Sequence, residues 1–332
     1  ASGIVNFGQD SSFTGDVTKQ GNKDANGIGD FYYPVPSGYK ALCSVNLPPT
    51  TSSVIRPQRH FDTVLYTGNG GTSQTISGIE FKPDLIWFKG LNHTAAFVWL
   101  DSVRGVTKNL RSNSNAQEGT TTAFLTSFNE DGFTVGQSGT TNGSSETNIA
   151  YCWKGGGAAV SNSDGTITTS ISANQEAGFS IVTYTGTGSA ATIGHGLGKV
   201  PKLVITKLRD TTTQDWFMNF GEITGSHGTS AVSDFTGDRG KYIKLNSTNA
   251  EASDTNVYPN TAATSTVYSV GTDNAVNGSG SSYVAYCWSE IPGYSKFGTY
   301  EGVDDGDGPY VYLGFRPAFL FIRRREGEDT VL

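Results

Sequence analysis

Residues that commonly build metal and redox sites are scarce in this sequence. Its three cysteines, Cys43, Cys152 and Cys287, show no CxxC spacing and do not make an even set, so the sequence predicts neither a disulfide framework nor a zinc site. The histidines also lack ligand spacing: His60, His93, His195 and His227. We therefore expect no metal and no cofactor. Cys152 and Cys287, each between Tyr and Trp, should be buried and reduced, as in a product folded in a cytoplasm.

Charge is also limited, and its sign excludes one class of partner. Charged residues make up 16% of the chain and the formal net charge is −7. Binding to nucleic acid needs a basic surface that releases counterions, so no nucleic acid partner is predicted. Apolar runs of membrane length are missing, so membrane insertion is not predicted either. The basic cluster Arg323–Arg325 precedes acidic residues and is interpreted as a solvated strand end.

Strong helix formers do not occur in long runs, whereas Gly reaches 43 residues. Apolar and polar residues alternate with period two, β-branched and aromatic residues are frequent, and Gly, Asn or Asp punctuates every eight to twelve residues or so. This pattern predicts an all-β protein of β-sandwich or jelly-roll-like repeat domains. The aromatic side chains expected in the cores are Trp87, Tyr151, Trp153, Tyr286 and Trp288.

The chain repeats itself. Pro83 and Pro201 stand 118 residues apart (201 − 83) in similar apolar segments, and Pro317 follows 116 residues later (317 − 201). The Ala-Tyr-Cys-Trp segments ending at Trp153 and Trp288 are 135 residues apart (288 − 153). The larger displacement predicts an insertion in the second copy between Lys207 and Arg239. Repeated folding units are typical of binding and structural proteins.

These repeats predict a modular organisation with two full copies and the start of a third. The third copy is expected to be cut off at Leu332, as part of a longer polypeptide. The expected parts are a terminal module at 1–48, a linker at 49–61, the first β repeat at 62–156, a linker with a short strand at 157–177, the second β repeat at 178–291, and the third copy at 298–332.

Three motifs resemble functional sites, namely a calcium loop, a phosphate loop and a glycosidase carboxylate pair, and each has a simpler interpretation. Asp304–Gly308 resembles a calcium loop but lacks the final Glu, so an acidic turn is preferred. Gly194–Gly198 precedes a strand instead of a helix, which favours a turn over a phosphate loop. A glycosidase would need two carboxylates, and the first copy offers four, but the second copy has no equally placed pair. These carboxylates are Asp101, Glu118, Glu130 and Asp131.

Two groups of residues are candidates for ligand or partner contact. Arg104 and Arg239 each follow a carboxylate and precede Gly, so they either fix a loop inside each repeat or bind a ligand. The second group is aromatic and is expected in a loop that differs between copies, either stacking on a sugar or partner or packing under the loop. Its members are Trp99, Trp216, Phe217 and Phe220. No catalytic residue is assigned.

The repeat motifs resemble a family of virion proteins of marine and cyanobacterial bacteriophages, in which a SPRY-like β-sandwich precedes tandem β-rich repeats. The resemblance is carried by Tyr66–Gly70, Phe81–Lys89, Leu100–Gly105, Ala150–Gly156, Gly178–Gly186 and His195–Gly198. Residues 1–48 resemble the last strands of the SPRY-like module, without its earlier strands.

The resemblance implies a non-enzymatic part of a virus particle, made in the cytoplasm of a host bacterium. We expect a tail-fibre-like or capsid-attached appendage that contacts the host or decorates the particle. The alternatives are a cement protein with no role in host binding and a carbohydrate-active virion enzyme. The expected partners are other virion proteins, a host surface polysaccharide or receptor, and further copies of the chain, with a trimer as the first expectation.

Overall fold

The computed structural model describes residues 7–37, 39–43, 46, 56–210, 214–221, 239–302 and 309–325. The chain divides into two compact units, Ala1–Ser52 and Ser53–Leu332. Most of the expected insertion between Lys207 and Arg239, and the acidic turn at Asp304–Gly308, lie outside the described residues. No helix in the described ranges is both long and apolar enough to cross a membrane.

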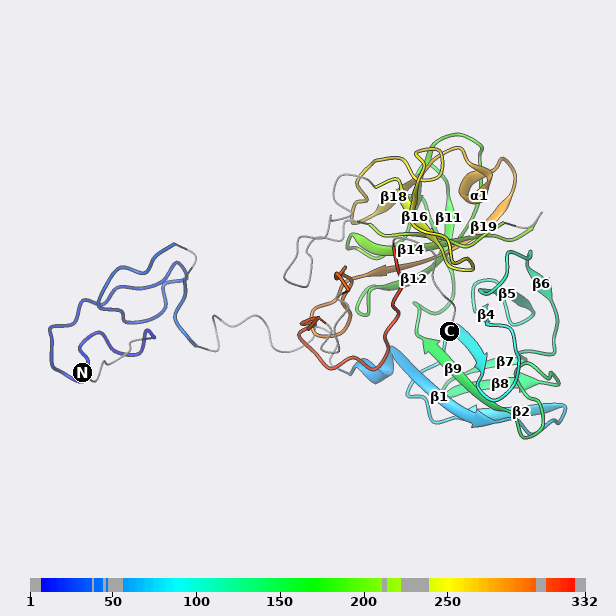
Figure 1. The fold of residues 1–332 in the computed structure, drawn as a ribbon, viewed down its shortest axis with the longest axis horizontal. Helices are drawn as coiled ribbons and strands as arrows, with labels where there is room; N and C mark the ends of the chain where they lie inside the picture. Colours follow the sequence, from blue (N-terminus) through cyan, green and yellow to red (C-terminus); the bar gives the residue numbers. More distant parts are fainter. Residues whose placement is uncertain are drawn as a thin grey trace. The chain divides into compact units, whose positions relative to one another are not determined.

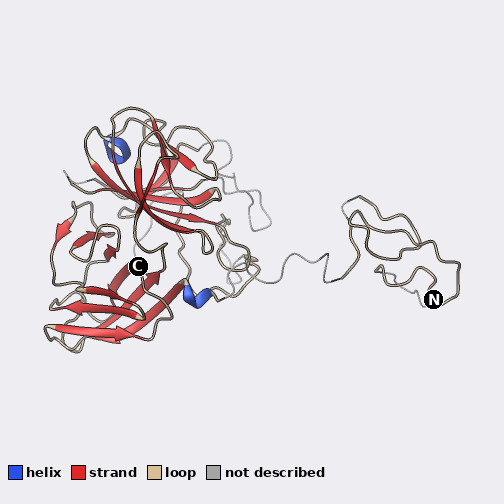
Figure 2. Ribbon diagram, turned by 180° about the vertical axis from the view of Figure 1, so that it is seen from behind, coloured by secondary structure: helices blue, strands red, loops and turns tan. Residues whose placement is uncertain are grey.

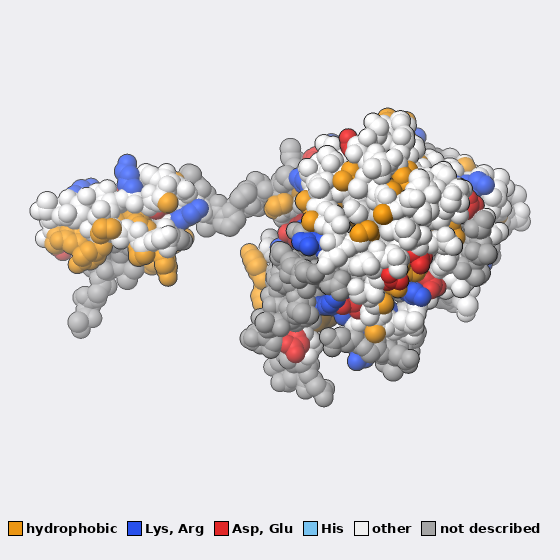
Figure 3. Space-filling view, turned by 90° about the horizontal axis from the view of Figure 1, so that it is seen from above, with side chains coloured by type: hydrophobic (Ala, Val, Ile, Leu, Met, Phe, Trp, Pro, Cys, Tyr) orange, Lys and Arg blue, Asp and Glu red, His pale blue; other side chains and the backbone are white. Residues whose placement is uncertain are grey.

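The N-terminal unit is built from turns. Its described residues contain one isolated bridge, Asn22 to Phe31, and no strand, so the expected final strands of a sandwich are not formed there. The Asp24 carboxylate organises the unit by accepting hydrogen bonds from the backbone N–H of Ile28 and Ala41 at 3.0 and 2.9 Å. Hydrophobic side chains gather along one side of this unit (Figure 3). Several apolar side chains of the unit are exposed, Tyr33 among them.

The larger unit is all-β and begins with the first repeat (Figure 1). A single 3₁₀ turn, η1 (Pro57–Arg59), precedes it. Its strands are β1 (Phe61–Thr67), β2 (Ser73–Ser77), β3 (Leu85–Gly90), β4 (Val98–Asp101), β5 (Lys108–Arg111), β6 (Gly119–Thr120), β7 (Ser127–Asn129), β8 (Gly132–Gly136) and β9 (Thr147–Trp153).

The second repeat includes the segment expected to be a linker, because two strands of that segment extend its main sheet. Its elements are β10 (Val160–Asn162), β11 (Thr169–Asn174), β12 (Phe179–Thr185), β13 (Ala191–Gly194), β14 (Pro201–Leu208), β15 (Phe217–Asn219), β16 (Lys241–Lys244), β17 (Ala252–Ser253), β18 (Val267–Val270), the short helix α1 (Asn274–Asn277) and β19 (Ser282–Ser289). Apart from α1 and η1, Figure 2 shows strands and loops.

The two repeats use the same strand pairing. In the first, β9 lies between β1 and β3, with Trp153 opposite both Phe61 and Leu85. In the second, β19 lies between β12 and β14, and Trp288 is opposite Phe179 and Leu203. The residues paired in one repeat are thus the sequence equivalents of those paired in the other, as the repeated motifs predict.

A buried asparagine explains why the repeats keep Tyr-Thr-Gly and Asn-Gly motifs. In the first repeat the Asn142 side chain donates to the carbonyls of Gly71 and Gly136 and accepts from the N–H of Asn69. Asn277 makes the equivalent bonds in the second repeat. Gly68 must be glycine because a Cβ there would lie 2.2 Å from the carbonyl oxygen of Gly143. The motifs thus close the loop that precedes β9 or β19.

Each repeat is a two-layer sandwich with its own core. The main sheet of the first repeat, β1-β9-β3-β4-β5-β6, packs on β2-β8-β7, and that of the second, β10-β11-β12-β19-β14-β15-β16-β17, packs on β13-β18. Cys152 lies in the first core and Cys287 in the second, and both are free and fully buried, which confirms the sequence prediction for these residues.

A third apolar layer joins the two repeats. It lies between the outer faces of the main sheets, where Trp99 meets Trp216 at 5.3 Å between ring centroids and Trp153 meets Trp288 at 6.2 Å. Trp153 and Tyr286 are buried, and the three other expected core aromatics, Trp87, Tyr151 and Trp288, are partly buried. These side chains were expected inside separate domain cores, but they hold the repeats to each other.

The start of the expected third copy does not form strands in its described residues, 309–325. Phe319 nevertheless contacts the same apolar layer as its sequence equivalents. It packs against the inter-repeat layer, as do Leu85 and Leu203. The third copy therefore contributes an apolar anchor, and the strand expected around it is wrong for the described residues.

Trp153→Ala should lower the free energy of unfolding by about 3 to 5 kcal/mol, because it removes a large aromatic that contacts both repeats. Since the layer is shared, chemical denaturation should still show one transition for the larger unit, shifted to lower denaturant. Tyr312→Ala is the control, because that ring is 68% exposed and its loss should change stability little. A melt of Trp153→Ala identical to the parent would contradict the assignment of Trp153 to the layer.

Candidate functional site

Arg104 is the predicted site residue with the most contacts. It follows β4 in a turn, and its side chain is fully buried. The guanidinium donates to Asp101 Oδ2 at 2.5 Å, Glu118 Oε2 at 3.0 Å and Tyr286 Oη at 3.0 Å. Because Tyr286 belongs to β19, Arg104 ties the first repeat to the second.

The same network contains a second crossing between repeats. Glu118 accepts two hydrogen bonds from the guanidinium of Arg209, at 2.9 and 3.1 Å, and its backbone N–H donates to the Arg209 carbonyl at 2.8 Å. Asp101 also accepts from Tyr286 Oη at 2.7 Å. Two carboxylates are thus matched by two guanidinium groups, which a buried ionic cluster requires.

Burial and pairing act in opposite directions on these groups. Burial would raise the pKa of Glu118, but hydrogen bonds from Arg209 and the charges of Arg104 and Arg209 outweigh it, so this pKa lies below its ordinary value. Burial would lower the pKa of Arg104, whereas the charge of Asp101 holds it above its usual range. Glu118 and Arg104 therefore stay ionised at neutral pH.

The four carboxylates considered for hydrolysis do not form one site. Asp101 and Glu118 are both engaged by Arg104 in the inter-repeat network. Glu130 and Asp131 lie at the turn between β7 and β8, where both are exposed and Glu130 lies 3.8 Å from Lys82. A pair of carboxylates facing a common open space is therefore not formed by these four residues.

The four aromatic candidates were expected in a loop that differs between copies, and this location is wrong for Trp99 and Phe217. Trp99 lies on β4 and Phe217 on β15, and Trp216 directly precedes β15. Trp99 and Trp216 meet in the inter-repeat layer, where Trp216 Nε1 donates to the carbonyl of Arg111 at 3.0 Å. Phe217 packs in the core of the second repeat, and Phe220 is a partly buried neighbour of the shared layer.

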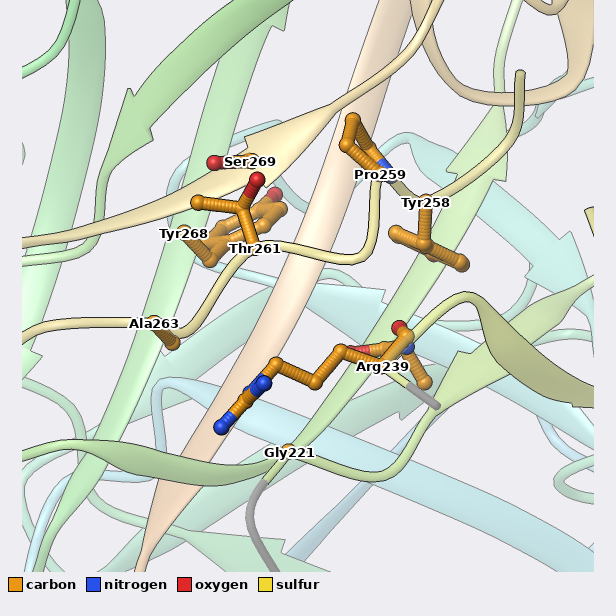
Figure 4. Close-up of a pocket in the computed structure, with 9 residues that line it drawn as sticks. Gly221, Arg239, Tyr258, Pro259, Thr261, Ala263, Tyr268 and Ser269 are labelled. Atoms are coloured by element: carbon orange, nitrogen blue, oxygen red, sulfur yellow. The ribbon is translucent and has the colours of Figure 1, made fainter. Parts of the chain in front are cut away.

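Arg239 lies apart from this network and lines a small pocket (Figure 4). Its side chain extends alongside the segment that carries Thr261 and Ala263, and its backbone N–H donates to Asn260 Oδ1 at 3.0 Å. The cavity measures about 20 Å³, which holds about one water molecule. Small-molecule sites are an order of magnitude larger, so this pocket as formed is not one.

A larger hollow lies on the face of the second main sheet and was not anticipated from sequence. Its volume is about 380 Å³, within the size range of ligand sites. Hydroxyl side chains form its floor in register across neighbouring strands, with Ser161 opposite Ser170, and Ser170 opposite Thr183. Arg209 lies at the hollow and connects it to the inter-repeat network. We call this surface the hydroxyl groove.

The hydroxyl groove left one signal in the sequence, the alternation of Ser170 and Ser172 with Ile171 in β11. That alternation places the hydroxyls on one face and Ile171 in the core beneath. The groove needs β10 and β11 to join the main sheet, whereas the sequence analysis expected a linker with a short strand that stays outside the repeat.

Glu118→Gln should destabilise the protein by about 3 kcal/mol at pH 7, because it leaves buried arginine charge less compensated. The pKa of Glu118 is lowered on folding, so its contribution is present above the ordinary value of 4.5 and is lost as pH falls through the folded value. Denaturant unfolding from pH 7 to pH 3 should therefore show a smaller loss of stability for the variant than for the parent.

Glu130→Gln is the matched control. It makes the same chemical change outside the network, because the side chain of Glu130 is 90% exposed. Equal effects of the two substitutions at pH 7 would show that the buried cluster does not stabilise the fold.

Comparison with known families gives one match. Residues 56–330 match the family model described as Domain of unknown function (DUF7483). Comparison with curated proteins and with solved structures gives no match to this chain. The matched range covers η1, both repeats and the segment around Phe319, so the family model corresponds to the larger compact unit. Since it spans well over half of the sequence, the chain belongs to the DUF7483 family.

Proposed function

We propose that the chain is a non-enzymatic structural component of a bacteriophage particle, an appendage on the tail or capsid that contacts the host or decorates the particle. The virion assignment rests on the sequence resemblance of the repeat motifs. The structural and non-enzymatic part of the proposal rests on the pairing of the buried charged residues with one another between the repeats.

The observation that carries the proposal is the inter-repeat network. Arg104 and Asp101 are completely buried and Glu118 is 10% exposed, and all three connect the first repeat to Tyr286 or Arg209 of the second. Reactive groups in an enzyme must reach substrate, whereas these groups face one another. Their arrangement supports a module whose purpose is to hold two sandwiches in one fixed relation.

The hydroxyl groove favours host contact over pure particle cementing. Its floor and rim supply several Ser and Thr hydroxyls, which both donate and accept hydrogen bonds. Sugars present the same mixed groups, so a polysaccharide chain is a chemically suitable occupant for a shallow open groove. In this proposal the partners are virion proteins, a host surface polysaccharide and further copies of the chain.

The virion assignment is tested by labelling particles. Antibodies against the purified protein should decorate intact phage particles at defined positions in electron micrographs, and the protein should co-purify with them. The location of the label separates tail from capsid. Recovery of the protein only in the unassembled fraction of a lysate would overturn the assignment.

The groove is tested by a blocking substitution. Thr183→Trp should fill it and weaken retention of the protein on immobilised bacterial lipopolysaccharide, while Thr75→Trp, on exposed β2, should not. Retention that is equally strong in both variants would leave the cement role as the better proposal.

Self-association follows from the exposed strand edges of both sheets. Edges such as β1 are commonly covered by closure or by a partner chain, and repeated copies of one chain favour closed symmetry. We expect a homo-oligomer, with a trimer as the first expectation, in sedimentation equilibrium at micromolar concentration. A monodisperse monomer under these conditions would contradict this part of the proposal.

A further inference from the structure

Arg209 is the one charged residue among the described residues that line the hydroxyl groove. It follows β14 directly, and its side chain is 21% exposed. The other lining residues are Tyr184 and seven serine or threonine residues. The described lining of the groove therefore combines neutral hydroxyl groups with a single positive charge.

Glu118 occupies only one edge of the Arg209 guanidinium. Arg209 Nε donates to Glu118 Oε2 at 2.9 Å, and Nη2 donates to Oε1 at 3.1 Å. A guanidinium carries five N–H groups in a planar fork, so two remain on Nη1 and one on Nη2. None of the described residues accepts a hydrogen bond from Nη1. The edge between Nη1 and Nη2 is thus a second fork, with the geometry that a carboxylate matches.

The contacts with Glu118 also hold this second fork in one orientation. The Glu118 backbone N–H donates to the Arg209 carbonyl at 2.8 Å, and the Glu118 carboxylate is itself held by Arg104 at 3.0 Å. A side chain that is already ordered loses little further freedom when a ligand binds. Arg209 is therefore preorganised for a second anionic group.

The other charged groups close to Arg209 in sequence neither replace it nor cancel its charge. Lys207 is 0% exposed and donates to the carbonyls of Asn115 and Gln214, so it cannot reach a ligand in the groove. Asp210 is exposed and is not part of the described lining. Solvent and salt screen an exposed carboxylate, so Asp210 opposes a bound anion only weakly.

The shape of the hydroxyl groove favours a long ligand over a small anion. The backbone N–H of Arg209 donates to the carbonyl of Ser282 on β19 at 2.9 Å, and the hydroxyl residues continue over β12 and β11 to Ser161 on the edge strand β10. From β14 to β10 there are four strand spacings, which cover about 19 Å. This length suits several linked sugar units.

We infer that the hydroxyl groove takes an acidic polysaccharide, with the carboxylate of a uronic acid unit on the second fork of Arg209. Hydroxyl groups of neighbouring units bond the Ser and Thr residues of the floor, which both donate and accept. This inference rests on the proposed function, since it names the class of polysaccharide that the same groove binds.

The test compares two forms of one sugar on the whole protein. The probes are a fluorescently labelled oligosaccharide of galacturonic acid and the same oligosaccharide after chemical reduction of its carboxylates, which leaves neutral galactose units. Fluorescence anisotropy should give a Kd about tenfold lower, or less, for the acidic form, because hydrogen bonds between two charged groups are the stronger ones. The comparison needs no substitution, so it does not depend on the stability of a variant.

Two matched substitutions locate the acidic group. Arg209→Lys keeps a positive charge beside Glu118 but removes the second fork, so the two forms should bind with nearly equal Kd. Arg59→Lys makes the same change at an arginine that is 53% exposed and paired with Glu80 outside the groove, and the preference should persist. Denaturant unfolding of both variants checks that they are folded.

Three results would overturn the inference. Equal affinity of the parent protein for the acidic and reduced forms would do so and would leave the proposed polysaccharide function in place. Equal loss of the preference in Arg59→Lys and Arg209→Lys would assign it to general surface charge. Binding of neither form would also overturn the inference, and if Thr183→Trp left retention on lipopolysaccharide unchanged as well, the proposed role of the groove would fall with it.

Discussion

The apolar layer between the two main sheets is the constraint on which the rest of the structure depends. Each repeat could bury one face of its main sheet under a small sheet, but the opposite face carries Trp99 and Trp153 in one repeat and Ile181 and Tyr286 in the other. Apolar burial is the dominant favourable term in folding, so these two faces are driven together. The result is four stacked β layers with three apolar interfaces, in place of two independent sandwiches.

The ionic network lies between the same two repeats and adds to the contact that the apolar layer makes. Ion pairs at this depth gain little net stability over an apolar core, but a broken pair is costly. We infer that Arg104 and Arg209 act mainly on specificity, because this arrangement of the repeats satisfies Asp101, Glu118 and Tyr286 together. The apolar layer supplies the favourable free energy of association between the repeats, and the ionic network fixes the orientation in which the two main sheets meet. The hydroxyl groove follows from the same geometry, because it lies where the second sheet extends past the apolar contact and Arg209 connects the two.

Local patterns in the sequence were sufficient to predict the all-β class, the correspondence between the two repeats and the burial of Cys152 and Cys287. These features depend on alternation and on motifs that occur twice, such as the segments ending at Trp153 and Trp288. The all-β sandwich fold was predictable for the same reason. The strands β4 and β15 have only four and three residues, too few to show a clear alternation, so Trp99 and Phe217 were assigned to a loop.

Contacts between repeats were not predictable in the same way. Nothing in the sequence near Arg104 points to Tyr286, which lies 182 residues away along the chain. The outer apolar face of each main sheet has the same composition as a core face, so it could not be assigned to a shared layer from one repeat alone. The segment 157–177, which carries β10 and β11, was interpreted as a linker with one short strand because it begins in a run of Gly and Ala. Their place in the sheet depends on pairing with β12.

The central claim is that the repeats are energetically one body, and a double-mutant cycle across the interface tests it most directly. The cycle combines Arg104→Met, in the first repeat, with Tyr286→Phe, in the second, and measures the free energy of unfolding of the parent, both single variants and the double variant. Residues in one buried network show coupling of about 0.5 to 3 kcal/mol, and this is the result that the structure predicts. Additive effects, with coupling indistinguishable from zero, would show that the two repeats fold independently and would contradict the account.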